Sequence, residues 1–157
     1  MRPVRPKPRE RGASIVELAL IAPVMVLLVM GVLDLGRAYR MNIRLENAAR
    51  EGAAFAQVYP NDVTCGPSGN IRGQVEREEP SLKATPAFTV VVEGQDAGGT
   101  FTPMSGCTGT VASAGERVRV RVSARYDIMT PLVAQAVGGS LTLTGDAEVR
   151  VQGQVRP

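Results

Sequence analysis

The sequence predicts an α+β protein in which a long, membrane-length N-terminal helix precedes a small, mainly antiparallel β-sheet domain with short helices. An uncharged run from Leu18 to Leu33 predicts the first half of the helix, and helically spaced small residues continue the pattern to about Tyr59. Strict apolar–polar alternation near the C-terminal end predicts strands. The 17 glycines and 11 prolines in 157 residues divide the remainder into short elements.

The N-terminal segment combines a basic leader with an apolar run. Cationic side chains crowd residues 1–11, namely Arg2, Arg5, Lys7, Arg9 and Arg11. Residues 13–33, about 21 in all, are enough to cross a hydrocarbon core as one helix. Because basic flanks stay on the cytoplasmic side, we expect a single-pass protein of the cytoplasmic (inner) membrane. Its N-terminus would be cytoplasmic and residues 60–157 would form a periplasmic or extracellular domain.

Three kinds of segment begin in this way. A cleaved secretory signal peptide is disfavoured because no small-x-small cleavage site follows the run. A plain signal anchor accounts for the hydrophobicity, but it leaves Gly12 and Glu17 together unexplained. In a signal like that of type IV pilins, residues 1–12 form a leader that is cut after Gly12. Ala13 is then the new N-terminus, and Glu17 is the fifth residue of the mature chain.

Glu17 has two interpretations that the sequence leaves open. In a membrane, its carboxylate could pair with the cationic α-amino group of Ala13 on a neighbouring subunit, and loss of that partner would leave a buried, unpaired charge. Ser14 and Glu17 also have the spacing of a capping box, in which the two side chains would accept hydrogen bonds from two free backbone N–H groups at the start of a helix. The second interpretation needs neither cleavage nor a partner.

The second half of the helix, residues 34–59, carries a stripe of small residues that lets another helix or a sheet approach closely: Ala48, Ala49, Gly52 and Ala53. Pro60 ends the pattern. Pro23 lies inside the membrane half, where it removes a backbone hydrogen bond with Ala19. It is either a site of bending during assembly or a tolerated membrane proline.

Beyond the helix, Ile71–Glu79 is expected to form one or two helical turns, and Phe88–Glu93 a strand. Gln95–Gly115 is expected to be a long exposed loop, because it is rich in turn residues. Cys65 and Cys107, the two cysteines of the chain, are expected to form one disulfide in an exported domain. A loop of about 40 residues would contribute about 3–4 kcal/mol. The alternative is a pair of unpaired thiols.

Two strands close the sequence. In Glu116–Tyr126, valines alternate with Arg117, Arg119 and Arg121, and in Leu141–Gln152 apolar and polar residues alternate likewise. Residues 130–139 between them are expected to form a short helix with Thr130 as N-cap, and Gly145 a bulge. If the strands pair, the arginines meet Asp146 and Glu148. The alternative is a patch for anionic lipid or an acidic partner.

The residue types indicate no enzyme. Histidine, the usual general base and metal ligand, is absent. Gly138-Gly139 lacks the lysine and the flanking pattern of a phosphate loop. We therefore expect no catalytic residue, no metal and no cofactor. Nucleic acid is not an expected partner, because an exported domain without stacking aromatics does not suit it.

The stretch from Arg11 to Ala56 resembles the TadE-like family, minor pseudopilins of the tight-adherence (Flp) pilus machinery. The resemblance is carried by Arg11-Gly12-Ala13, Val16-Glu17, Pro23, Gly31, Asp34-Leu35-Gly36-Arg37 and Asn47-Ala48-Ala49-Arg50-Glu51-Gly52-Ala53. It implies cleavage between Gly12 and Ala13 by a prepilin peptidase, with Glu17 as the recognition and assembly carboxylate. The family's major pilins carry an aromatic residue where this chain has Leu18.

The resemblance implies a structural role in assembling a type IV pilus-like apparatus for cell adhesion or secretion. The expected partners are other pilins and pseudopilins, Tad assembly proteins, prepilin peptidase and membrane lipid. Two other functions fit the same residues less well. One is a membrane-anchored binding or adhesion module outside any pilus, with Gln95–Gly115 as its contact loop. The other is an anchored hydrolase, for which no spacing of acids provides a site.

Overall fold

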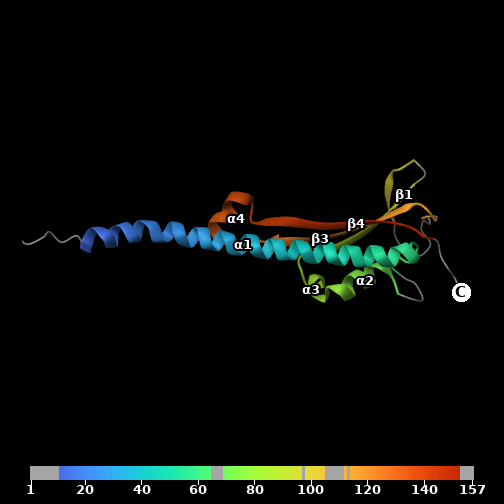
Figure 1. The fold of residues 1–157 in the computed structure, drawn as a ribbon, viewed down its shortest axis with the longest axis horizontal. Coiled ribbons are helices and arrows are strands. Elements are labelled where there is room, and N and C mark those ends of the chain that lie inside the picture. Colours follow the sequence, from blue (N-terminus) through green and yellow to red (C-terminus); the bar gives the residue numbers. More distant parts are fainter. Residues whose placement is uncertain (1–10, 65–68, 97, 105–111, 113, 153–157) are drawn as a thin grey trace, which may run out of the picture.

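A computed structural model of the chain describes residues 11–64, 69–96, 98–104, 112 and 114–152. It consists of one very long helix, α1, and a four-stranded sheet with three short helices (Figure 1). The elements follow in the order α1 (Arg11–Val58), α2 (Ile71–Glu78), α3 (Pro80–Lys83), β1 (Thr89–Gln95), β2 (Phe101–Met104), β3 (Arg117–Asp127), α4 (Pro131–Val137) and β4 (Ser140–Arg150). The predicted α+β arrangement is thereby confirmed.

The helix α1 has 48 residues and runs without interruption through Pro23. At 1.5 Å per residue it is about 70 Å long. Its N-terminal half projects alone beyond the rest of the molecule, and its C-terminal half lies along the sheet (Figure 1). The helix ends at Val58, just before Pro60, because proline cannot continue the hydrogen-bonding pattern.

The sheet is antiparallel throughout, with strand order β2-β1-β3-β4. The long pair β3–β4 places Val120 opposite Ala147 and Arg119 opposite Glu148. The predicted alternation is confirmed on β3, where Val118, Val120 and Val122 are fully buried. They pack in one core with residues of α1 and α2: Leu45, Ala48, Ala49, Ala53, Ile71 and Val75.

The long loop expected from Gln95 to Gly115 is wrong in part, because β2 forms inside it. Phe101 pairs with Gln95, and Pro103 pairs with Glu93, after a tight turn. In that turn the Gly99 N–H donates to the Asp96 carbonyl at 2.9 Å, and Gly99 has a φ of +85°. β2 lies at the sheet edge, where a proline is tolerated because one side of the strand needs no donor. Cys65, Cys107 and their expected disulfide lie outside the described residues.

The bulge expected at Gly145 is also wrong. Gly145 pairs regularly with Val122, with no extra residue on either strand. The glycine instead lets β4 touch the backbone of α1: a Cβ at this position would lie 2.4 Å from the backbone carbon of Leu45 and 2.4 Å from the nitrogen of Glu46. A glycine inside a strand marks either a bulge or a close backbone approach, and here it marks the second.

Candidate functional site

The N-terminal half of α1 is an apolar rod whose side chains are left exposed by the described parts of the domain. Ile15, Leu20 and Val32 are 69%, 71% and 68% exposed, and the most apolar 18-residue window of the helix is 0% buried. By length and composition this helix can cross a membrane. Soluble proteins rarely leave so large an apolar surface open to water. The exposed rod therefore indicates single-pass membrane anchoring.

Gly12, Ala13 and Glu17 all lie on exposed turns at the start of this rod. The helix already runs through Ser14 from Arg11, so Ser14 is not an N-cap and no capping box forms in the uncut chain. Among the described residues, none makes a hydrogen bond or ion pair with Glu17. The structure thus presents a single carboxylate on an otherwise apolar surface, which is costly in lipid unless a partner neutralises it.

The stripe of small residues lies on a different part of α1, under the sheet of the same chain. Ala48, Ala49 and Ala53 have no exposed surface. A Cβ on Gly52 would lie 2.6 Å from the Val75 side chain and 3.2 Å from that of Val120. The stripe is therefore occupied by the chain's own β3 and α2. Pro23, in contrast, lies in the exposed half.

A buried carboxylate joins the apolar rod to the domain. Asp34 follows the apolar run directly and is only 6% exposed. Its carboxylate accepts hydrogen bonds from the hydroxyl of Thr130 at 2.6 Å, the N–H of Thr130 at 2.9 Å and the N–H of Met129 at 3.4 Å. The hydroxyl of Tyr126 donates to the Asp34 backbone carbonyl at 3.2 Å. These bonds attach α1 to the corner between β3 and α4. We call the four residues that make them, Asp34, Tyr126, Met129 and Thr130, the junction.

The junction explains a difference from the expected cap of α4. Thr130 occupies the N-cap position, but its side chain makes no capping hydrogen bond. Its hydroxyl donates to Asp34 instead, because a hydrogen bond to a carboxylate is stronger than one between neutral groups. Sequence reasoning missed this role. The signal was an acid placed immediately after an apolar run, with Arg37 three residues further along the helix.

The surroundings at the junction shift two pKa values in opposite directions. The Thr130 hydroxyl holds the pKa of Asp34 below its ordinary 3.8, against the opposing effect of burial, and the N–H groups of Thr130 and Met129 add to the lowering. Burial raises the pKa of Tyr126 above 10.0, and the charge of Asp34 raises it further. At neutral pH the pair is therefore a charged acceptor and a neutral donor.

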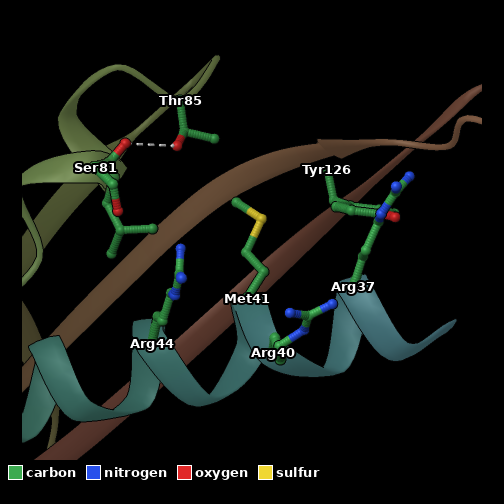
Figure 2. A pocket seen from close by; sticks show the side chains of 8 residues that line it. Arg37, Arg40, Met41, Arg44, Ser81, Thr85 and Tyr126 are labelled. Carbon is green, nitrogen blue, oxygen red and sulfur yellow. Dashed lines mark hydrogen bonds between the residues drawn. The ribbon is translucent and has the colours of Figure 1, made fainter. Parts of the chain in front are cut away.

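A groove of about 380 Å³ lies next to the junction on the α3 side of α1. Figure 2 shows Arg37 beside Tyr126, with Arg44 rising from α1 toward Ser81 beyond Met41. Arg37 and Arg40 lie one turn apart, and Arg44 one turn further. The groove is consequently basic, with the hydroxyl-bearing residues Ser81 and Thr85 on its far wall.

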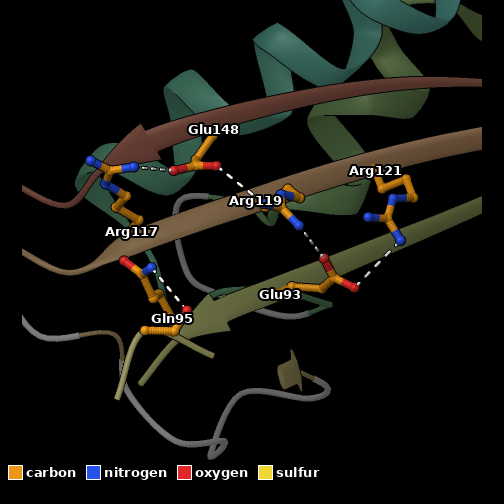
Figure 3. Close-up of polar contacts among 7 residues, drawn as sticks. Glu93, Gln95, Arg117, Arg119, Arg121 and Glu148 are labelled. Carbon is orange, nitrogen blue, oxygen red and sulfur yellow. Dashed lines mark hydrogen bonds and ion pairs between the residues drawn. The ribbon is translucent and has the colours of Figure 1, made fainter. Parts of the chain in front are cut away.

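On β3, Arg117, Arg119 and Arg121 are paired, as the first of the two interpretations of this sheet face expects (Figure 3). Arg117 and Arg119 approach Glu148 at 2.8 and 3.3 Å, and Arg119 and Arg121 approach Glu93 at 3.7 and 3.6 Å. Asp146 lies opposite Arg121 in the register but forms no ion pair within the described part of the chain. Arg121 is paired with Glu93 on β1 instead of with the expected Asp146.

No arrangement for metal binding appears in the described ranges, where no three histidine, cysteine, aspartate or glutamate side chains converge. Three features of the described surface could contact other molecules: the apolar rod with Glu17, the junction at Asp34 and the basic groove.

The comparisons with known proteins bear on the same helix. No curated protein and no solved structure matches the chain. A family model described as TadE-like protein matches residues 12–54. The matched segment holds Gly12, Glu17, Asp34 and the small residues under the sheet, so the resemblance to the TadE-like family is confirmed over most of α1.

Proposed function

We propose that this protein is a minor pseudopilin of a tight-adherence pilus or of a related secretion apparatus. The observation that carries the proposal is the coincidence of two features in α1. The segment that matches the TadE-like family model begins at Gly12, and the first part of that segment, residues 13–33, is an exposed apolar helix in which the Glu17 carboxylate has no partner among the described residues. A structural subunit that packs among similar helices needs both features.

The proposed arrangement has a basic leader over residues 1–12, a membrane segment over 13–33 and an amphipathic half-helix over 34–59 that supports the domain of residues 60–157. The cationic leader favours a cytoplasmic N-terminus. The sheet domain would then lie outside the cytoplasmic membrane. The junction at Asp34 would hold that domain at a fixed position along the rod, because Asp34 is the first residue after the apolar run.

The proposed mechanism begins with cleavage between Gly12 and Ala13 by a prepilin peptidase. The cut would create a cationic α-amino group on Ala13, since an α-amino group has a pKa of about 7.7–8.0. Glu17 of one subunit would then pair with Ala13 of its neighbour inside the lipid. Removal of one member of a buried ion pair leaves the other charge unpaired at a cost of about 3–5 kcal/mol. Helices without this pair would therefore be excluded from the assembly.

Lateral packing would use the exposed rod, from Ala13 to about Leu33. The small residues from Ala48 to Ala53 are already covered by the sheet of the same chain. Neighbouring subunits would therefore meet along the rod and along the outer surfaces of the sheet domains. Other pilins, pseudopilins and Tad assembly proteins are the partners that this geometry suits.

The proposal is tested by the variant Glu17→Gln, which keeps the size of the side chain and removes its charge. We expect the variant to reach the membrane but to be lost from complexes with its pilus partners, measured by cross-linking in intact cells. Glu51→Gln is the matched control on the exposed face of the same helix. Normal complexes and normal surface filaments with Glu17→Gln would overturn the proposal.

A further inference from the structure

Three arginines of the groove beside the junction have no counter-ion among the described residues. In the described part of the chain, no carboxylate lies within ion-pair distance of Arg37, Arg40 or Arg44. Within the described ranges, the one acceptor of Arg37 is the thioether sulfur of Met129. The arginines that do form ion pairs lie away from the groove. They are on the C-terminal part of α1, on α2 and on β3: Arg50, Arg72, Arg117, Arg119, Arg121 and Arg125.

The unpaired arginines lie at the level of lipid headgroups if residues 13–33 span the membrane. The headgroup layer extends about 5–8 Å beyond the hydrocarbon on each side. Arg37 is four residues past Leu33, or about 6 Å along the helix, and Arg40 is about 10 Å along it. Helical side chains lean toward the N-terminus, which here is the membrane side. Both guanidinium groups can therefore reach a phosphate at the outer face.

A second groove, of about 580 Å³, adjoins the first and is mainly apolar, with Asp34, Arg37 and Thr130 also among its lining residues. Its walls come from α1 within the membrane segment, at Val26, Met30 and Leu33, and from Met129 and Pro131 at the corner before α4. Met129 and the neighbouring Leu132 are 67% and 58% exposed. These apolar side chains lie beside the part of α1 that would be in hydrocarbon, so the corner itself would enter the outer leaflet.

Arg37 lines both grooves. A basic groove that continues into an apolar groove matches a molecule with an anionic end and a hydrocarbon end. We propose that the two grooves hold one anionic glycerophospholipid of the outer leaflet, with its phosphate at Arg37 and Arg40 and an acyl chain against Met30 and Met129. An acidic protein segment would match the basic groove alone, because it has no hydrocarbon chain to fill the apolar groove. This inference rests on the membrane placement in the proposed function.

The same proposal accounts for an otherwise unfavourable charge distribution. Arginines just outside the membrane on the exported side oppose the orientation that the basic leader favours. An anionic lipid would neutralise Arg37 and Arg40 there, while Arg44, one turn further out, would add to the attraction.

The direct test is native mass spectrometry of the full chain in detergent, with phosphatidylglycerol or phosphatidylcholine of identical acyl chains added. Each of the two arginines at the phosphate should favour the anionic lipid about fivefold, so retention of phosphatidylglycerol should exceed that of phosphatidylcholine about 25-fold. The triple variant Arg37→Gln, Arg40→Gln, Arg44→Gln should lose this preference. The triple variant Arg50→Gln, Arg72→Gln, Arg125→Gln removes the same charge elsewhere and should keep it.

Three results of this experiment would overturn the proposal: equal retention of the two lipids by the unmodified chain, an unchanged preference in the groove variant, or equal loss in the control variant. Glycerol 3-phosphate, a headgroup without acyl chains, should not displace phosphatidylglycerol at equal concentration. If it does, the site takes a soluble anion and not a lipid. Should the triple groove variant fail to fold, Arg40→Gln alone should still reduce the preference several-fold, since Arg40 makes no hydrogen bond to a described residue.

The placement of the acyl chain has its own test. The chain contains no tryptophan, so Leu132→Trp provides a single tryptophan at the corner. Phospholipids brominated on the acyl chain should quench this tryptophan in reconstituted vesicles, and they should not quench Glu78→Trp on α2. Absence of quenching at position 132 would overturn the proposal. Neither experiment needs cleavage after Gly12 or a pilus, so failure of the proposed pseudopilin role would be seen separately, in the Glu17 variants.

Discussion

At the scale of single residues, Asp34 is the side chain that relates the membrane segment to the domain. Its carboxylate receives hydrogen bonds from two backbone N–H groups and one hydroxyl group of the corner before α4, and from the hydroxyl of Tyr126 at the end of β3. A buried carboxylate is stable only when its acceptor sites are satisfied in this way. Because the bonded groups lie more than 90 residues apart in the sequence, the junction fixes where the domain sits along α1.

The contribution of the junction can be measured with Thr130→Val, which removes the hydroxyl donor and keeps the size of the side chain. A hydrogen bond to a charged group contributes more than one between neutral groups, so we expect the thermal midpoint in detergent to fall by about 5 °C. Thr85→Val is the control, since the Thr85 hydroxyl donates to the Ser81 carbonyl in an exposed turn. Equal midpoints for the two variants would show that the Thr130 hydroxyl has no special role.

Gly145 makes a second prediction at this scale. Gly145→Ala would place a methyl group 2.4 Å from the backbone of Leu45 and Glu46, and neither backbone can move without shifting α1 or β4. We expect a loss of about 3 kcal/mol in the free energy of unfolding, at the upper end of the range for overpacked cores. Gly36→Ala is the control, because a Cβ there meets nothing within 4 Å. A tolerated Gly145→Ala would mean that the helix and the strand are further apart.

At the scale of elements, Glu93 on β1 is the acid that organises the polar face of the sheet. It lies between Arg119 and Arg121, which belong to β3, and its side chain is only 13% exposed. Arg119 also lies 3.8 Å above the ring of Phe101 on β2. The polar face therefore joins three neighbouring strands, in addition to their backbone hydrogen bonds.

We therefore expect Glu93→Gln to lower the free energy of unfolding by about 1 kcal/mol. Asp146→Asn, on the other side of β3, should change it by less than half as much, because Asp146 forms no ion pair with a described residue. Denaturant unfolding of the two variants side by side checks this difference. Equal effects would mean that Asp146 takes part in the pairing as the sequence alone indicated.

The sequence was sufficient for elements whose pattern is long and regular. The apolar run predicted the first half of α1, and the valine–arginine alternation predicted β3 and its buried face. It was not sufficient for β2, because four residues that include Pro103 carry no periodic signal and are specified by pairing with β1. It also could not show that Gly145 meets the backbone of Leu45, since that contact joins residues far apart in the chain.

The candidate site divides in the same way. Gly12, Glu17 and the apolar run are local in the sequence and could be singled out from it. The junction and the two grooves depend on where the corner before α4 falls along α1, which no local pattern encodes. The small residues Ala48, Ala49 and Ala53 were recognisable as a packing face, but only the fold shows that the chain's own sheet covers them.

At the scale of the whole molecule, the way in which the stability of the domain changes with pH follows from carboxylates whose pKa values are lowered. Three pKa values are lowered by hydrogen bonds to the carboxylate. Thr130 lowers the pKa of Asp34, Lys83 lowers the pKa of Glu76, and Arg117 lowers the pKa of Glu148. The folded protein therefore binds fewer protons than the unfolded chain, whose ordinary values are 3.8 for Asp and 4.5 for Glu. The stabilising contribution is complete above these ordinary values and is lost as the pH falls through the lower, folded values.

We accordingly expect the thermal midpoint of the protein in detergent to be nearly constant from pH 6 to 8 and to fall steadily below about pH 4.5. Asp34→Asn should lower the midpoint at pH 7 and should flatten its decline in acid, because one of the groups that loses its charge is gone. Midpoints measured across this pH range for both proteins check the sign. A midpoint that rises toward acid pH would contradict the pairing of these carboxylates.

The measurement that addresses the central claim most directly is the N-terminal residue of the protein isolated from membranes that contain a prepilin peptidase, determined by intact mass and N-terminal sequencing. We expect a mature chain that begins at Ala13, with Glu17 as its fifth residue, and an uncut chain when Gly12 is replaced by a bulkier residue. A leader that stays attached in the native protein, or a mature chain that starts beyond Leu33, would contradict the claim that the apolar rod is the assembling part of a pseudopilin.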